Sequence, residues 1–392
     1  MMSTSELGET PDPATAKAAP DEATPGEPGT PHRENGEKPS SHGASLHWQD
    51  LLLLASVAAC LVIAATAWYL LKEFASLLRP LLLAVFLCYV ILPSHHRLTR
   101  RIPPFASIVV LAGVSVGLMV LVALQILGSA AQLSEEMPRL IARGEAILLS
   151  VEGYFIEHLP HWLAEGAREV ARGQTQSAGR LQQAVGILAS AAADTLTEAV
   201  LVGIYLIFLL VEAGRVPRRI EGAFTGANAG EILGVVGNIN EAMAGYLHVK
   251  VKASLVLALP ATVVLWAFGV KFAAMWGLLT FLLNFIPYLG SIISCGTPIL
   301  LAYLQMDSMG TPTVVAVLLI GIHTLSAYVV EPAMTGRAVG LSPLIILLAL
   351  SFWGLCWGVT GMLLAVPLTV MVKIVLENIE FMRPVARLMA ED

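Results

Sequence analysis

Charged residues are scarce in this sequence. Only 13% of its 392 residues are Asp, Glu, Lys or Arg, whereas 56% are hydrophobic; a soluble globular domain carries about 25% charged residues. The mean hydropathy of +0.74 agrees with this balance. The formal net charge of -6 comes largely from a polar amino-terminal tail and one polar internal segment, so it indicates no nucleic-acid partner. The composition is therefore that of a polytopic membrane protein.

Motifs for nucleotide hydrolysis and metal binding are also missing. The sequence has no Gly-x-x-x-x-Gly-Lys-Ser/Thr phosphate loop, which argues against a pump that hydrolyses ATP through that fold. It has no His-Glu-x-x-His motif, and its four cysteines lie in apolar runs without the spacing of metal ligands. We therefore expect no enzyme activity, no cofactor and no bound metal.

The amino-terminal part divides into a tail and a set of apolar helices. Residues 1–48 are rich in Pro, Glu, Gly, Ser and Thr and show no apolar period, which predicts a disordered tail. Apolar runs between 49 and 128 predict three transmembrane helices. The loop after the second run contains Arg97, Arg100 and Arg101, and short basic loops stay in the cytoplasm. We therefore expect the amino terminus in the cytoplasm as well.

The rest of the chain alternates between amphipathic and apolar segments. Between 129 and 195, apolar residues recur at helical spacing among charges, which predicts amphipathic helices outside the hydrocarbon. Residues 196–380 predict a transmembrane core with discontinuous helices, and 381–392 a cytoplasmic tail. The predicted fold class is an all-α polytopic membrane protein with about seven to eight transmembrane or re-entrant helices.

Polar and helix-breaking residues interrupt the apolar core at two places, the first at 283–290. Pro287 has no amide hydrogen, so a helix through it loses the bond to the carbonyl four residues earlier. In hydrocarbon, that carbonyl needs a partner from protein or water. A spacing of four also places Thr280, Asn284 and Tyr288 on one helix face. The stretch therefore predicts a broken helix with a polar stripe.

The second place precedes a proline near residue 332. At about 100° per residue, four polar residues fall within an arc of about 140° on one helix: His323, Thr324, Tyr328 and Glu331. A lone carboxylate near the bilayer centre costs at least about 2.5 kcal/mol, so Glu331 needs water, a proton or a cation beside it. Glu331 is either a ligand for solute or proton, or the end of a helix at the cytoplasmic interface, paired with Arg337. For His323 we favour a packing role.

Two motifs carry a resemblance to a known family. They are Asn-Phe-Ile-Pro-Tyr-Leu-Gly at 284–290 and Glu-Pro-Ala-Met-Thr-Gly-Arg-Ala-Val-Gly-Leu-Ser-Pro at 331–343. With Trp353-Gly354 and Ala-Val-Pro at 365–367, they make the chain resemble the autoinducer-2 exporter (AI-2E) family, the PerM-like permeases. The resemblance implies a homo-oligomeric permease of the bacterial inner membrane that releases small polar solutes such as autoinducer-2. It also implies exchange of sodium or lithium for protons as an alternative.

These patterns predict a multi-pass permease that exports, or lets pass, a small polar solute. The expected pathway residues are Thr280, Asn284, Tyr288, Ser291, His323, Thr324, Tyr328, Glu331 and Arg337. The expected hinges are Pro287, Gly290, Pro298, Pro332, Gly336 and Pro343.

Two other functions remain open on the sequence alone. The first is a sodium (lithium)/proton antiporter in which Glu331 titrates. The second is a membrane scaffold that transports nothing and binds a partner through the helices of 132–194. The expected partners are the lipid bilayer, a small polar solute or cation, and further copies of the chain.

Overall fold

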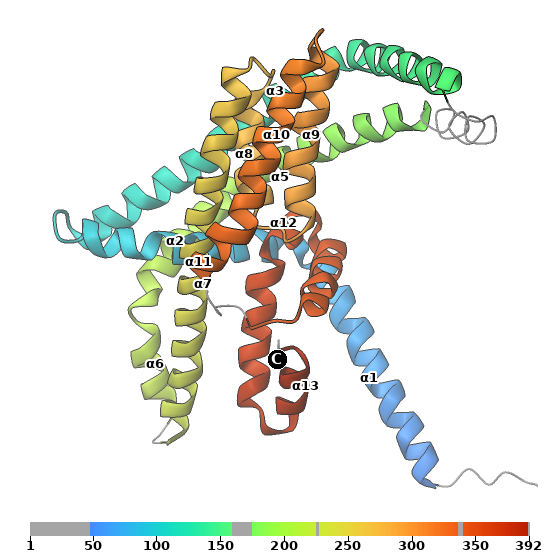
Figure 1. Ribbon diagram of the computed structural model, residues 1–392. Coiled ribbons are helices and arrows are strands. Elements are labelled where there is room, and N and C mark those ends of the chain that lie inside the picture. Colours follow the sequence, from blue (N-terminus) through green and yellow to red (C-terminus); the bar gives the residue numbers. More distant parts are fainter. Residues whose placement is uncertain (1–47, 159–174, 225–226, 336–339, 391–392) are drawn as a thin grey trace, which may run out of the picture. The chain divides into compact units, whose positions relative to one another are not determined.

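The computed structural model describes residues 48–158, 175–224, 227–335 and 340–390. No strand occurs among the described residues (Figure 1). Seven of their helices are long and apolar enough to cross a membrane, and α8 (Ala273–Leu283) and α9 (Leu289–Gln305) are shorter apolar helices. The predicted all-α polytopic class is therefore confirmed. The predicted tail at 1–48 lies outside the described residues except for Trp48, where α1 (Trp48–Glu73) begins.

Two of the apolar helices are far longer than a membrane crossing. Helix α1 begins in a unit that ends at Ala59, and the chain from Cys60 onward forms a second unit. In the second unit, α2 (Ala75–Leu98) is followed by α3 (Pro104–His158), of 55 residues, and α5 (Thr175–Ala213), of 39 residues. The predicted boundaries at 128 and 195 fall inside continuous helices, because the helical period continues there without a breaker.

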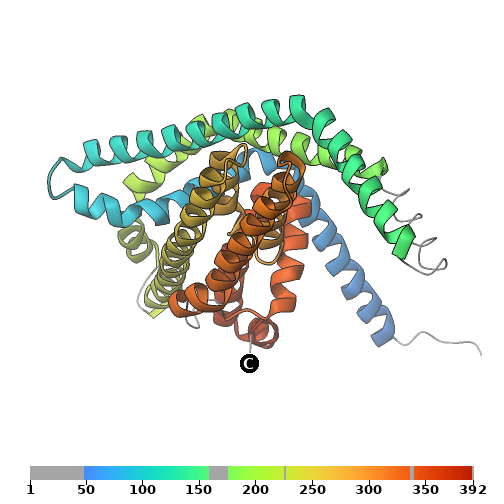
Figure 2. The same cartoon turned by 45° about the horizontal axis from the view of Figure 1, so that its top comes forward.

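Helices α3 and α5 pack along each other (Figure 2). Their polar parts share an apolar seam in which Leu133 and Met137 of α3 meet Ala192 of α5, with Val185 and Leu188 packed against it. The amphipathic segment is therefore an extension of two membrane helices, and its apolar stripe is used at least in part within the chain.

A short helix, α6 (Val216–Ala223), leads into α7 (Ala227–Ala267), and α7 and α8 form a hairpin around Gly269. The Lys271 amide donates a 3.0 Å hydrogen bond to Gln305 Oε1, which places the beginning of α8 beside the end of α9. Since the two helices also pack on each other, they form a short antiparallel hairpin. Its turn is the predicted break at 284–288.

A full-length span separates this hairpin from a second one. It consists of α10 (Gly310–Leu325), the π-helical segment η1 (Ser326–Val330) and α11 (Glu331–Thr335). Next comes α12 (Pro343–Asn378), in which Trp357 and Gly358 leave helical geometry. A Cβ atom on Gly361 would lie 1.9 Å from the Trp353 carbonyl oxygen, so the two arms of α12 lie against each other. Helix α12 is therefore a hairpin of two helical arms.

The two hairpins enter from opposite sides. We call the side where α9 ends and α10 begins side 1, and the side where α11 ends and α12 begins side 2. The span 310–334 is long enough to cross a bilayer, so the α8–α9 hairpin opens toward side 1 and the α12 hairpin toward side 2. They meet where Leu283 and Ile286 pack in one cluster with Ala349, Leu350 and Ala365.

The carboxyl-terminal residues close the base of the second hairpin. After the turn η2 (Glu380–Met382), helix α13 (Arg383–Leu388) packs on α12. The Ser342 amide donates a 3.0 Å hydrogen bond to the Met389 carbonyl. The part of the predicted tail at 381–390 therefore folds back onto the protein, while residues 391–392 lie outside the described residues.

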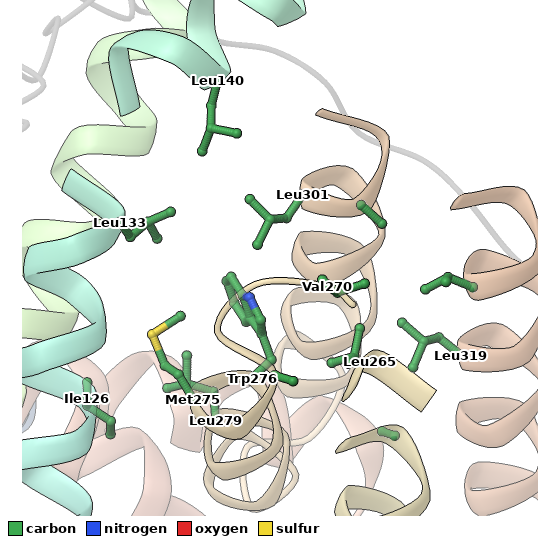
Figure 3. Packing of buried hydrophobic residues seen from close by; sticks show 14 of the residues in the cluster. Ile126, Leu133, Leu140, Leu265, Val270, Met275, Trp276, Leu279, Leu301 and Leu319 are labelled. Atoms are coloured by element: carbon green, nitrogen blue, oxygen red, sulfur yellow. The ribbon is translucent and has the colours of Figure 1, made fainter. Parts of the chain in front are cut away.

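The largest apolar cluster lies at side 1, between α3 and the helices α7 to α10. Trp276, Met275 and Leu279 of α8 lie in it with Leu301 of α9 and Leu319 of α10 (Figure 3). Two ion pairs border it on α3. Glu136 binds Lys271, with oxygen-to-nitrogen distances of 2.7 and 2.8 Å, and Arg143 lies 2.6 Å from Asp307. The α7–α8 turn, which contains Lys271, and the α9–α10 turn, which contains Asp307, are therefore both bound to α3 by ion pairs.

Candidate functional site

The first polar feature is the turn at 284–288, which joins α8 to α9. The Leu283 carbonyl, which a helix through Pro287 leaves free, accepts a 2.8 Å hydrogen bond from the Ile286 amide. Tyr288 has φ of 62°, a conformation rare for a side-chain-bearing residue. The sequence thus placed the break correctly, and the freed carbonyl finds its partner in a tight turn of the backbone itself.

The polar residues around this turn point in two directions. Asn284 is buried and donates a 3.0 Å hydrogen bond to the Ser254 hydroxyl of α7. Thr280 is also buried, and its hydroxyl donates to the Trp276 carbonyl of its own helix. Tyr288 and Ser291 are exposed. The predicted stripe is therefore buried at Thr280 and Asn284 and exposed at Tyr288, and Asn284 is its member that bonds to a polar group of another helix.

The π-helical segment η1 determines the second polar feature. The Glu331 amide donates to the Ser326 carbonyl, five residues back, so the chain makes one wide turn before α11. This turn returns Glu331 to the face of the helix that carries Ser326 and His323. In a regular α-helix, five residues would rotate Glu331 about 140° away from Ser326. The π segment therefore lines up a different set of residues from the predicted arc.

Glu331 has a partner on α7. Lys250 Nζ lies 2.7 Å from Glu331 Oε1, and the two side chains are 14% and 32% exposed. Lys250 lies one helical turn from Ser254, the partner of Asn284. Both polar features therefore converge on one stretch of α7. Arg337, the partner of Glu331 that the sequence suggests, lies outside the described residues.

Two buried polar atoms on the same helix face have no hydrogen-bond partner among the described residues. They are His323 Nε2 and Ser326 Oγ, in residues that are 9% and 4% exposed. The residues buried before them on α10 recur at helical spacing, at Val315 and Leu319. His323 and Ser326 thus continue the buried face of this helix.

The position of these two atoms follows from how α7 and α10 pack. At side 1, Val315 and Leu319 lie in one cluster with Leu265 of α7, and toward side 2 Glu331 binds Lys250. The two helices therefore run antiparallel. The stretch of α7 from Lys250 to Leu265 is nearly as long as the stretch from the Val315 and Leu319 cluster to Glu331. His323 and Ser326 consequently lie between the apolar cluster and the ion pair, at about the level of Ser254. Polar groups from α7, α8, α10 and η1 thus gather at one level of the protein.

The remaining predicted residues lie elsewhere. Thr324 is exposed and Tyr328 is 79% exposed, so the predicted arc is not a buried face of this chain. Pro332 occupies the second position of α11, so the helix irregularity precedes it. Pro343 begins α12, and Pro298 lies buried inside α9 without ending it. Gly336 lies outside the described residues.

The sequence pattern alone missed Lys250, Ser254 and Ser326. Ser326 lies three residues after His323, a spacing that places two residues on one helix face. Lys250 and Ser254 are four residues apart on α7, which places two polar residues on one face of this helix. These spacings could have been read from the sequence as polar helix faces. The pairing between residues of different helices could not be read from the sequence.

A cavity of about 20 Å³ lies between α2, α7 and α12, near Tyr89, Met243 and Pro367. This volume holds about one water molecule, and its lining is mostly apolar. It is therefore too small to serve as a solute site in the conformation described.

One segment has the spacing of a hydrolase nucleophile motif, Gly113-Val-Ser115-Val-Gly117. It lies inside α3, and the Ser115 hydroxyl donates a 2.7 Å hydrogen bond to the Leu111 carbonyl of the same helix. The motif requires a sharp turn between a strand and a helix. This serine therefore does not form a nucleophile elbow.

The family model of AI-2E family transporters matches residues 57–381. The chain belongs to the AI-2E transporter family. It is 30% identical over 314 residues to the AI-2 transport protein TqsA of Escherichia coli, covering 78% of this chain and 86% of TqsA. It is 29% identical over 334 residues to the protein MT0215 of Mycobacterium tuberculosis, covering 83% and 87% of the two chains. The predicted resemblance is therefore confirmed.

Membership of the AI-2E transporter family identifies the chain as a multi-pass membrane transport protein. The stretch 284–290, on which the resemblance rested, forms the turn of the α8–α9 hairpin. The described part of the other motif, which begins at Glu331, forms α11 and the start of α12. Both motifs therefore occupy the places where helices break inside the transmembrane core.

Proposed function

We propose that this AI-2E family protein lets a small, neutral, polar solute cross the membrane along the contact between α7 and the span α10–η1–α11. The observation that carries the proposal is the pair of buried, unpartnered atoms His323 Nε2 and Ser326 Oγ. They lie at about the level where Asn284 bonds Ser254.

A buried polar group without a partner costs free energy, so a solute that bonds to these two atoms would recover that cost. Each one costs about 1–3 kcal/mol relative to a satisfied group. A solute that carries hydroxyl groups supplies both a donor and an acceptor, so one such molecule satisfies the ring nitrogen and the serine hydroxyl together. Ser254 and Asn284 offer a second polar pair nearby. The site therefore favours solutes with several hydroxyls.

The relatives give this chemistry a candidate substrate. TqsA is named as a transport protein for autoinducer-2, and autoinducer-2 is a small signal rich in hydroxyl groups. We assign export of such a solute to this chain, with side 1 outside the cell and side 2 in the cytoplasm. This orientation keeps the basic loop around Arg100 in the cytoplasm, as the distribution of positive charge favours, and we also propose a cytoplasmic amino terminus. A homo-oligomer in the bacterial inner membrane completes the proposal.

The structure supports the neutral-solute proposal over the two alternatives. In an antiporter, a proton or a cation would have to displace Lys250, which lies 2.7 Å from the Glu331 carboxylate. A scaffold would use the apolar stripe of the amphipathic helices, but Val185, Leu188 and Ala192 of this stripe pack with α3 of the same chain. Export of a neutral solute requires neither condition.

The test uses purified protein in liposomes loaded with labelled autoinducer-2. Wild-type protein is expected to speed efflux over empty liposomes, while Ser326→Ala and His323→Leu each slow it by about tenfold, the effect of one lost hydrogen bond. Thr324→Val is the matched control, because Thr324 is the exposed neighbour of His323. If wild-type protein passes no solute, the proposed transport function is wrong. If both variants show full efflux, the solute does not pass beside His323 and Ser326.

A further inference from the structure

The ion pair between Lys250 and Glu331 has a place of its own in the bundle. It joins α7 to α11 on the side 2 flank of His323 and Ser326, and the nitrogen-to-oxygen distance is 2.7 Å. Lys250 is 14% exposed, so its ammonium group is mostly removed from water. A solute that leaves the level of Ser326 toward side 2 between these helices must pass this pair.

Few other charges on the packed elements face the pair. On α7, the neighbouring Lys252 is exposed, on the other side of the helix from Ser254. Tyr246, one turn away on α7, is buried and packs with Met243 and Leu247. Helix α11 carries no charged residue besides Glu331. On α12, which also packs on α7, Lys373 lies 3.5 Å from Glu377 and is therefore paired too. Apart from the exposed Lys252, these charges balance.

We propose that Lys250 sets the charge selectivity of the route, because it neutralises Glu331 and so keeps cations from following the neutral solute. This inference rests on the proposed function and adds a specificity-determining residue to it. In a medium of low dielectric constant, a single fixed charge attracts ions of opposite sign strongly. A paired charge offers them little attraction. Removing one partner therefore creates an ion site where the protein has none.

The four combinations of charge give four separate predictions. Lys250→Met leaves Glu331 alone and gives the level a negative charge, so sodium ions are expected to pass. Glu331→Gln leaves Lys250 alone and gives a positive charge, so chloride is expected to pass in place of sodium. The double variant Lys250→Met/Glu331→Gln is neutral again and is expected to exclude both ions. Lys250→Arg keeps the charge and is expected to behave as wild type does toward ions.

The measurement is efflux of radioactive sodium and radioactive chloride from proteoliposomes, with all variants compared at the same pH. We expect Lys250→Met to raise sodium efflux by about tenfold or more over wild type. Lys252→Met is the matched control, because it removes the same charge two residues away on the exposed side of α7. It is expected to leave ion efflux at the wild-type level.

The outcomes separate this inference from the proposed function. If wild type passes labelled autoinducer-2 but Lys250→Met passes no sodium, the charge-selectivity role of Lys250 is wrong while the permease stands. If wild type itself passes sodium as fast as Lys250→Met does, the pair is no barrier to cations. If neither single variant inserts, the double variant is the test. Ion exclusion by the double variant supports the role of the net charge, and ion leakage through it contradicts that role.

Discussion

Gly290 lies so close to the Leu283 carbonyl that a Cβ atom on it would stand 1.7 Å from that oxygen. The first turn of α9 therefore passes directly over the last turn of α8. No side chain fits between them, so the tight turn at 284–288 depends on a glycine at this position. The same contact explains why the turn can keep the Leu283 carbonyl satisfied by the Ile286 amide.

Gly290→Ala is expected to destabilise the protein, because the backbone of α8 or α9 must shift to admit the methyl group. Overpacking of this kind costs about 1–3 kcal/mol. The measurement is the thermal unfolding midpoint of detergent-purified protein. Gly296→Ala on the same helix is the control, since nothing lies within 4 Å of its added Cβ. An unchanged midpoint for Gly290→Ala would show that α8 and α9 do not approach this closely.

Asn284 and Ser254 are expected to be energetically coupled. Asn284→Leu removes the donor and leaves a buried serine hydroxyl, so it should cost about 1–3 kcal/mol. Ser254→Ala in the same chain removes the stranded hydroxyl and should recover part of that loss. A double-mutant cycle on unfolding midpoints measures the coupling, expected at about 0.5–1.5 kcal/mol. Additive effects would place the two side chains apart.

The opposed hairpins predict which residues share a side of the membrane. In a variant without native cysteines, Ser308→Cys near the end of α9 and Glu380→Cys after α12 lie on opposite sides. An impermeant maleimide added to intact cells is expected to label the first and to label the second only after the cells are opened. Labelling of both from outside would contradict opposite entry of the hairpins, and labelling of Glu380→Cys alone would invert the proposed orientation.

The ion pair between Glu136 and Lys271 is expected to hold the α7–α8 turn on α3. Glu136→Lys should lower the unfolding midpoint slightly, since exposed pairs contribute about 0.2–1 kcal/mol. Adding Lys271→Glu restores opposite charges and should recover the loss, and high salt should reduce both effects. If Lys271→Glu does not restore the unfolding midpoint that Glu136→Lys lowers, the contact is not electrostatic.

Hydropathy and helix breakers predicted most of the fold. The break at Pro287 followed from a residue that a helix cannot accommodate without a change in geometry. The boundaries near 128 and 195 did not, because the helical period of α3 and α5 runs unbroken from hydrocarbon into the polar extension. A change in composition is therefore not a change in secondary structure.

The candidate site was predicted in part. Asn284, His323 and Glu331 belong to it, but the arc that also included Tyr328 assumed regular α-helical rotation, and the π segment changes that rotation. The partner of Glu331 was out of reach for local patterns, since Lys250 lies 81 residues away in sequence. Ser254 escaped for the same reason. Pairing between distant helices needs the structure.

The central claim is that the solute passes beside Ser326, between α7 and η1. Ser326→Cys in the variant without native cysteines tests it through reaction with a small, charged, water-soluble thiol reagent in proteoliposomes. We predict that Ser326→Cys reacts, that an excess of autoinducer-2 slows the reaction, and that the modified protein no longer passes the solute. If Ser326→Cys stays unmodified while Ser308→Cys reacts fully, water and solute do not reach this level, and the proposed route is wrong.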